Sequence, residues 1–400
     1  MEMQVVIMGL GYIGLPTAAL IASKKIHVHG VDVNKSVVDT INKGKIHIVE
    51  PDLDGLVHYD VQQGYLVAGS QPKKADVFLI AVPTPFKGDH QPDITYVEKA
   101  TKMAIPFLRE GNLFILESTS PVGTTEKLAK LIFKLRPELK GKISIAYCPE
   151  RVLPGSVIYE LQHNDRVIGG VDAKSTDSAV NFYSKFVKGE LHRTNARTAE
   201  MCKLTENAYR DVNIAFANEL SMICDKAEIN VNELIDLASK HPRVKILKPG
   251  PGVGGHCIAV DPWFIVADFK NEAKIIKQAR LTNNYKREWV IEKIIKAADA
   301  FKKKNKRNAV IACMGLAYKP DIDDLRESPA LEIVHDLEKM KYKVLAVEPN
   351  VSQHRDLRIT DSAKAALEAD IIVFLVAHKE FKKLSVEKDK VVMDFCGVIK

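Results

Sequence analysis

Short apolar runs alternate with amphipathic segments from residue 1 to about residue 185 of this 400-residue chain. Runs that are apolar at consecutive positions are typical of strands buried on both faces of a parallel sheet. The pattern predicts strands at 4–8, 27–32, 77–82, 113–116 and 143–147. It therefore indicates an α/β fold with a doubly wound parallel sheet, whose ligands are expected at the carboxyl ends of the strands.

The pattern changes near residue 196, where long helices are predicted at 198–227 and 273–304. A second α/β block follows, with strands predicted at 309–315, 343–347, 371–376 and 391–394. We expect two Rossmann-like domains with doubly wound parallel sheets, residues 1–195 and 306–400, joined by a central helical domain, residues 196–305. The long apolar face of 273–304 exceeds what one domain needs to cover, and this predicts a homodimer formed through the central helices.

The first strand runs into a glycine-rich turn that contains Gly9, Gly11 and Gly14. This spacing between a strand and a helix is typical of dinucleotide-binding domains. The first glycine permits the tight turn, the second lets the backbone approach a pyrophosphate, and the third lets helix and strand pack closely. Asp32 ends the next strand, where a carboxylate accepts hydrogen bonds from ribose hydroxyls and repels a 2′-phosphate. The sequence therefore predicts NAD as the cofactor.

A second glycine-rich run, residues 250–255, is followed by Cys257 and, four residues later, by Asp261. Glycines at this density allow positive φ and close approach of the backbone to a ligand. A thiol on such a loop is a candidate nucleophile. The alternative, a buried and inert cysteine beside a flexible loop, is left open by this motif alone.

Lys203, Asn207 and Arg210 fall at i, i+4 and i+7 of the predicted helix 198–227, and so lie along one side of it. Such stripes usually face water. A helix between two α/β blocks has little free surface, however, and Asn207 and Arg210 are poor choices for solubility alone. The pattern leaves a solvent-facing and a functional stripe equally open.

Composition narrows the class of protein. The net charge of +7 is dispersed, without the interleaved aromatic residues of a nucleic-acid surface, so we expect small anionic ligands and no nucleic acid. The six cysteines form no CxxC pair, which predicts no disulfide framework and no metal site. No apolar run is long enough to cross a bilayer, so we expect a cytoplasmic protein without membrane contact.

Several motifs occur along almost the whole chain: 9–16, 82–85, 117–119, 149–151, Lys203 with Asn207, 252–261, 315–320 and 323–329. In this order and at this spacing, they resemble the UDP-glucose/GDP-mannose dehydrogenase family. The resemblance implies a four-electron oxidation of a sugar C6 alcohol by NAD in two hydride transfers. It also implies that Cys257 captures the aldehyde as a thiohemiacetal, which becomes a thioester and is hydrolysed to a uronate.

The resemblance also implies roles for other residues. Lys203 would be the acid/base and electrostatic partner, and Asn207 an oxyanion donor. Asp261 would assist through an ordered water, and Glu150 would assist water during thioester hydrolysis. The implied NAD site consists of Gly9, Gly11, Tyr12, Ile13, Gly14, Asp32, Thr84, Thr119 and Arg326. The implied UDP-sugar contacts are Arg151, Val152, Lys203, Asn207, Arg210, His241, Arg243, Gly254, Tyr318 and Lys319. Relatives often carry a basic residue where this chain has Cys396, so that contact is not carried over.

The run Gly255-His256-Cys257 through Phe264 most resembles the members of the family that oxidise UDP-N-acetyl-D-mannosamine for surface polysaccharide synthesis. The same reaction on UDP-N-acetylglucosamine or UDP-glucose is the first alternative. A two-electron hydroxyacid dehydrogenase is the second, although it would have no use for Cys257 or for the second α/β block. The third is a nucleotide-sugar sensor without activity.

Overall fold

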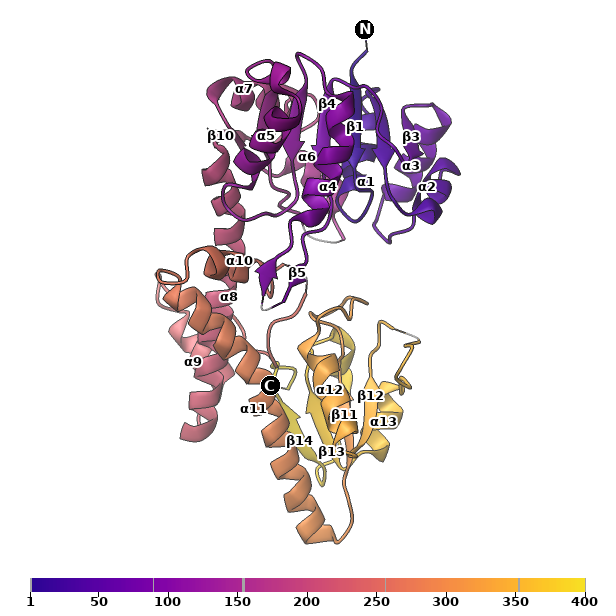
Figure 1. Cartoon of the computed structure of the whole chain (residues 1–400). Coiled ribbons are helices and arrows are strands. Elements are labelled where there is room, and N and C mark those ends of the chain that lie inside the picture. Colours follow the sequence, from indigo (N-terminus) through magenta and orange to yellow (C-terminus); the bar gives the residue numbers. More distant parts are fainter. Residues whose placement is uncertain (1, 89, 153–154, 256, 352, 400) are drawn as a thin grey trace. The chain divides into compact units, whose positions relative to one another are not determined.

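The computed structural model describes residues 2–88, 90–152, 155–255, 257–351 and 353–399. The chain divides into two compact units, residues 1–206 and 207–400 (Figure 1). The helical segment after residue 206 and the last α/β block therefore belong to one unit. The three-domain division at residues 195 and 305 stays a prediction.

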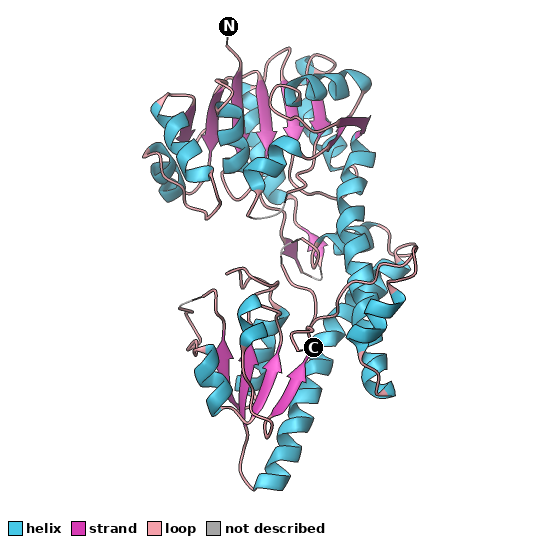
Figure 2. Ribbon diagram, turned by 180° about the vertical axis from the view of Figure 1, so that it is seen from behind, coloured by secondary structure: helices cyan, strands magenta, loops and turns pink. Residues whose placement is uncertain are grey.

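An eight-stranded sheet in the order β10-β9-β8-β7-β4-β1-β2-β3 forms the centre of the first unit (Figure 2). Its strands are β1 (Gln4–Met8), β2 (His27–Val31), β3 (Leu66–Gly69), β4 (Val77–Ile80), β7 (Leu113–Leu116), β8 (Ser144–Tyr147), β9 (Arg166–Gly170) and β10 (Leu191–Asn195). All neighbours pair in parallel except β8 and β9. The doubly wound parallel sheet is confirmed. At one edge, β9 and β10, which were not predicted, run against the other strands, an arrangement common in such sheets.

Both faces of this sheet are covered, as the apolar runs predict. One core contains Val5 and Ile7, and the other contains Val6 and Met8, because successive side chains of a strand point to opposite faces. The first core includes residues of α1 (Gly14–Ala22), α2 (Lys35–Asn42), α3 (Leu53–Gln62), α6 (Val157–His163) and α7 (Ala173–Tyr183). The second includes residues of α4 (Thr95–Ala104) and α5 (Thr124–Leu135), and the start of α8 (Ala196–Ala227). A short hairpin, β5 (Phe86–Lys87) with β6 (Gln91–Pro92), follows β4.

The second unit contains most of α8, then α9 (Val231–Ala238), α10 (Asp261–Asp268) and α11 (Lys274–Asn305). Its parallel sheet has the order β12-β11-β13-β14. The strands are β11 (Val310–Met314), β12 (Lys343–Val347), β13 (Ile371–Phe374) and β14 (Val391–Asp394), and the remaining α-helices are α12 (Pro329–Lys339) and α13 (Ser362–Glu368). No helix in the described part of the chain combines the length and the apolar character needed to cross a bilayer.

The apolar face of α11 is covered along only part of its length. Val290, Ile291 and Ile294 are buried in the core beside β11 and β13, together with residues of α12. This part of the face is thus covered within the unit, whereas Ile275, Leu281 and Tyr285 near the start of α11 are exposed. The homodimer through the central helices stays a prediction.

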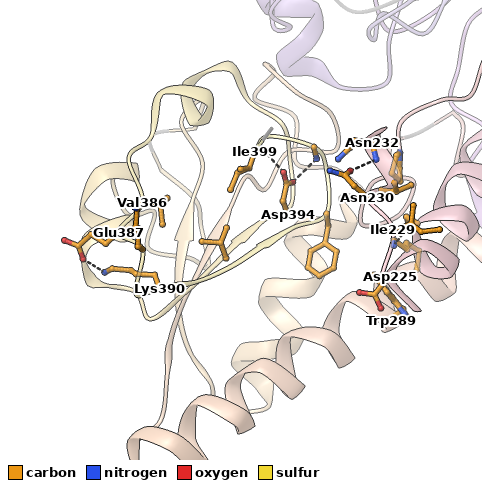
Figure 3. Close-up of a pocket in the computed structure, with 18 residues that line it drawn as sticks. Asp225, Ile229, Asn230, Asn232, Trp289, Val386, Glu387, Lys390, Asp394 and Ile399 are labelled. Carbon is orange, nitrogen blue, oxygen red and sulfur yellow. Dashed lines mark hydrogen bonds and ion pairs between the residues drawn. The ribbon is translucent and has the colours of Figure 1, made fainter. Parts of the chain in front are cut away.

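A cavity of about 680 Å³ lies within the second unit, between the C-terminal segment and helices α8 and α11 (Figure 3). Lys286 lines it, with only 1% of its surface exposed. Its Nζ lies 2.6 Å from Ser221 Oγ and 3.8 Å from the centroid of the Trp289 ring. Burial lowers the pKa of Lys286 to about 7, although Asp225 opposes the shift. A charged ammonium is therefore costly here near neutral pH.

Lys286→Met should stabilise the protein most at low pH. Between the folded pKa of about 7 and the unfolded value of 10.5, the unfolded chain binds the proton more tightly, so the free energy of unfolding of the wild type rises with pH. Below the folded value, the whole penalty is present. We expect the advantage of the variant to shrink by about 2–3 kcal/mol between roughly pH 6.5 and pH 9, measured by urea unfolding.

The matched control is Lys296→Met, which changes an exposed lysine on the same helix. A stability difference for Lys286→Met that stays constant with pH would contradict the lowered pKa.

Candidate functional site

The turn after β1 forms a cradle for a dinucleotide. Gly9 has φ of +94°, and a Cβ at Gly14 would lie 1.8 Å from the Gly9 carbonyl oxygen, so the fold itself requires both glycines. A Cβ at Gly11 would meet no protein atom within 4 Å. Protein packing therefore leaves space beside Gly11, where the backbone of such a turn approaches a pyrophosphate. The residues present fit NAD.

Asp32 lies at the carboxyl end of β2 and is hydrogen-bonded to the glycine-rich turn after β1. Its carboxylate accepts the amides of Leu10 at 3.0 Å and Asn34 at 2.8 Å. These bonds fix the carboxylate beside the glycine turn, where it can receive the ribose hydroxyls.

The next two strands bring Thr84 and Thr119 together. The Thr84 hydroxyl donates to the Thr119 carbonyl at 2.7 Å, so the loops after β4 and β7 are joined at the same edge of the sheet. Tyr12 is 48% exposed at the start of α1, and Ile13 precedes that helix. All the implied NAD contacts of the first unit thus follow strands β1, β2, β4 and β7.

A second cluster of the first unit joins Lys203 to the loop after β8. Lys203 Nζ donates to the Glu150 backbone carbonyl at 2.7 Å and lies 3.8 Å from Glu150 Oε2, while only 7% of Lys203 is exposed. The Glu150 carboxylate also accepts the Val152 amide. Arg151 pairs with Glu206 at 2.8 Å and donates to the Asp165 carbonyl. Lys203 and Glu150, an ammonium and a carboxylate suited to proton transfer, are therefore direct neighbours.

In the second unit, Cys257 is exposed at the end of the glycine-rich loop. Its carbonyl accepts the amides of Val260 at 3.1 Å and Asp261 at 2.8 Å, where α10 begins. The Asp261 carboxylate is buried and accepts Asn207 Nδ2 at 2.6 Å. Because Cys257 is exposed, it is not the buried core cysteine of the alternative reading. The other cysteines of this unit, Cys224, Cys313 and Cys396, are buried.

The glycine-rich loop packs against Tyr318. A Cβ at Gly254 would lie 2.3 Å from the Glu327 carbonyl oxygen, and one at Gly255, whose φ is +82°, would lie 3.0 Å from the Tyr318 ring. Burial, with the negative charges of Asp324 and Cys257, raises the pKa of Tyr318. Glycine is required here because the backbone passes this close to its neighbours.

The turn that carries Tyr318 and Lys319 is anchored by Glu348. This buried carboxylate accepts the amides of Leu316 at 2.8 Å and Ala317 at 3.0 Å, and lies 3.0 Å from His378 Nε2. Burial alone would raise its pKa, but these hydrogen bonds hold the pKa of Glu348 below its ordinary value.

Other residues implied by the resemblance are dispersed over the exposed surface. Arg210 is exposed on α8, and His241 and Arg243 are exposed on the turn after α9. Arg326 pairs with Asp324 at 2.6 Å. The contacts of these side chains with substrate and cofactor stay predictions. His256, which belongs to the run that resembles the family, lies outside the described residues.

A cluster of buried polar side chains on α8 and α11, next to the glycine-rich loop, was not predicted from the sequence. Asp211 and Asn218 on α8, and Arg280 and Asn283 on α11, are at most 3% exposed. A signal was available, since Asp211 and Asn218 follow Asn207 at four and eleven residues, on the same side of a 3.6-residue helix.

Comparisons with known proteins agree with this geometry. Residues 3–187 match the NAD binding domain of the UDP-glucose/GDP-mannose dehydrogenase family, 197–285 its central domain, and 312–400 its UDP binding domain. A UDP-N-acetyl-D-mannosamine dehydrogenase of Campylobacter jejuni is 57% identical over 98% of this chain and 99% of its own length.

Two further relatives differ in the sugar that their names give. An NDP-N-acetyl-D-galactosaminuronic acid dehydrogenase of Ralstonia nicotianae is 52% identical, covering 98% of this chain and 95% of its own. The solved structure of a UDP-D-ManNAc dehydrogenase from Pyrococcus horikoshii matches with a TM-score of 0.91 and 39% identity, over 100% of this chain and 96% of that one. The chain is an NAD-dependent dehydrogenase and belongs to the UDP-glucose/GDP-mannose dehydrogenase family.

Proposed function

We propose that this enzyme oxidises the C6 alcohol of UDP-N-acetyl-D-mannosamine to the uronate, in the cytoplasm, for surface polysaccharide synthesis. The observation that carries the proposal is the exposed Cys257 thiol on a tightly enclosed glycine loop, in a chain 57% identical to a dehydrogenase of that name. All six cysteines are free thiols, which suits a reducing compartment.

NAD supplies two hydride acceptors in succession, so one alcohol, one water and two NAD⁺ give one carboxylate, two NADH and three protons. After the first oxidation, the Cys257 thiolate attacks the C6 aldehyde and forms a thiohemiacetal, which retains the hydride for the second oxidation. The thioester that results is cleaved by water, and Cys257 leaves as a thiolate. Covalent capture also prevents release of the reactive aldehyde.

The resemblance assigns roles to two pairs of polar groups, one pair in each unit. Lys203, held by Glu150, would be the acid/base and electrostatic partner of the C6 oxygen: as an ammonium it stabilises the developing negative charge, and it can accept the alcohol proton only after passing its own proton to Glu150 or water. Glu150 would help to activate the hydrolytic water. Asn207 directs one amide N–H at Asp261, and the second N–H of the same group would serve an oxyanion. Arg151, Arg210, His241, Arg243 and Lys319 would hold the UDP pyrophosphate and sugar, since cationic side chains suit phosphate.

The primary test is the NADH formed per UDP-N-acetyl-D-mannosamine consumed, for the wild type and for Cys257→Ser. We expect two NADH in the wild type and loss of steady turnover in the variant. A serine hydroxyl cannot form the thioester through which the second oxidation passes. One NADH per sugar, or a variant equal to the wild type, would contradict the proposal.

A second candidate substrate follows from the Ralstonia relative, namely a nucleotide N-acetylgalactosamine sugar. Initial rates on UDP-N-acetyl-D-mannosamine, UDP-N-acetylglucosamine, UDP-N-acetylgalactosamine and UDP-glucose separate these possibilities. A clear preference for any sugar other than the first would replace the substrate while leaving the two-NADH chemistry intact.

We also propose that the enzyme is a homodimer. Tyr209, Phe216 and Ile223 recur every seven residues along α8, and each is more than half exposed. An apolar stripe with heptad spacing is typical of a helix that pairs with another helix. This stripe of α8 and the exposed apolar residues near the start of α11 together support pairing through the central helices.

Phe216→Glu should convert the protein to a monomer, because the change places a charge in the middle of this stripe. Light scattering measures the mass directly. Tyr59→Glu, at an exposed aromatic residue of α3, is the matched control and should keep the dimer. A wild type that is monomeric at micromolar concentration would contradict the proposal.

A further inference from the structure

A buried network of hydrogen bonds links α8 to α11 and ends on the backbone of the glycine-rich loop. Arg280 Nη1 donates to Asp211 Oδ1 at 2.6 Å, and Asn283 Nδ2 donates to the same oxygen at 2.8 Å. Asn218 Nδ2 donates to Asn283 Oδ1 at 2.9 Å. The side-chain oxygen of Asn218, Oδ1, accepts a hydrogen bond from the Gly250 N–H at 2.9 Å. One side-chain amide thus connects the helix pair to the first residue of the loop.

The same network limits the middle of the loop. A Cβ at Gly252, whose φ is +151°, would lie 3.3 Å from the Asn283 carbonyl oxygen and 3.0 Å from Pro329 Cβ. The loop therefore passes between the helix that carries Asn283 and the start of α12, with no room for a side chain. Any shift of Asn283 would be transmitted to the loop through contact as well as through Asn218.

A second set of hydrogen bonds holds the chain on the C-terminal side of Cys257. Asn207, eleven residues before Asn218 on α8, donates to Asp261, and the Asp261 amide donates to the Cys257 carbonyl. Eleven residues are close to three full turns, so both asparagines project from one side of α8. Cys257 thus lies between two points, Gly250 and Asp261, that are each held by an asparagine of the same helix.

The buried ion pair of this network contributes little to the stability of the fold. The side chains of Arg280 and Asp211 form an ion pair and are 4% and 0% exposed, and among the described residues no group forms a hydrogen bond with Asp211 Oδ2 or Arg280 Nε. Removing two charges from water costs free energy that their attraction often fails to recover, and apolar residues of similar size are frequently as stable. Packing of α8 on α11 therefore does not explain why polar residues stand at these positions. Orientation of the loop does, because only a polar group can hold the Gly250 amide.

We propose that Asn218 is a positioning residue for Cys257, holding the start of the glycine-rich loop so that the thiol meets the aldehyde before it escapes. The inference rests on the covalent mechanism proposed above. A nucleophile misplaced by about 1 Å can cost roughly 100-fold in rate, which is the scale of effect expected here.

The test is Asn218→Leu, which keeps the side-chain volume and removes the bond to Gly250. We expect kcat to fall by about 10- to 100-fold with KM changed less than about threefold. The distinguishing readout is the fate of the aldehyde. NADH per sugar should drop below two, and free aldehyde should be detected with a carbonyl-trapping reagent, because capture by Cys257 is impaired.

Asn112→Leu is the matched control for a loss of stability alone. Asn112 is a buried asparagine of the first unit that accepts the Arg109 amide and donates to the Ala75 carbonyl, both at 2.8 Å. It should lower the melting temperature to a similar extent while two NADH per sugar are retained. Asn218→Ser, which keeps a hydroxyl and leaves room for water, replaces Asn218→Leu if that variant does not fold, and should show the same defect in weaker form.

The outcomes separate this inference from the proposed function. A wild type that forms fewer than two NADH per sugar would contradict the covalent mechanism itself. A wild type that forms two, with Asn218 variants that also form two and lose no more activity than Asn112→Leu, would overturn the positioning role alone.

Discussion

The position of Cys257 depends on how a glycine-rich loop with little conformational preference of its own is held in place. Glycine loses more backbone freedom on ordering than any other residue, so such a loop takes one shape only where neighbouring groups define it. Here those neighbours are the asparagines of α8 on one side and Tyr318, Glu327 and Pro329 on the other. The reactive thiol is exposed, but the backbone that carries it is enclosed.

Two similar turns support different chemistry in the two α/β blocks. Gly9 and Gly315 have almost the same φ, +94° and +92°, and each donates its amide to the carbonyl at the end of the next strand at 2.8 Å. Gly11 leaves open space in the first block, whereas Ala317 stands at the equivalent position of the second. In the second block, Glu348 binds two amides of the turn and fixes Tyr318 beside the glycine-rich loop. The same backbone geometry thus suits a dinucleotide in one block and a different ligand in the other.

Much of the fold could be predicted because its signals are local. The strand at 4–8 and the helix bounds near 227 and 304 follow from apolar periodicity, and β1, α8 and α11 agree with them to within a residue or two. β9 was not predicted, because Arg166–Gly170 is a short strand with two glycines and a charged residue. The buried Asn218 network could not be predicted either, since its members come from two helices about seventy residues apart and meet only through packing. The family resemblance assigned roles to Lys203 and Glu150 but did not predict the contact between them, and the pattern on the helix alone left the role of Lys203 open.

Amide hydrogen exchange of the loop measures most directly whether Cys257 is held from both sides. The account predicts that the amides of Gly250, Val260 and Asp261 exchange at least about 100-fold more slowly than those of the exposed turn at 387–389, because each of the three is a hydrogen-bond donor within the unit. Exchange of these three amides as fast as that of the exposed turn would contradict the account, since the loop would then be free in solution.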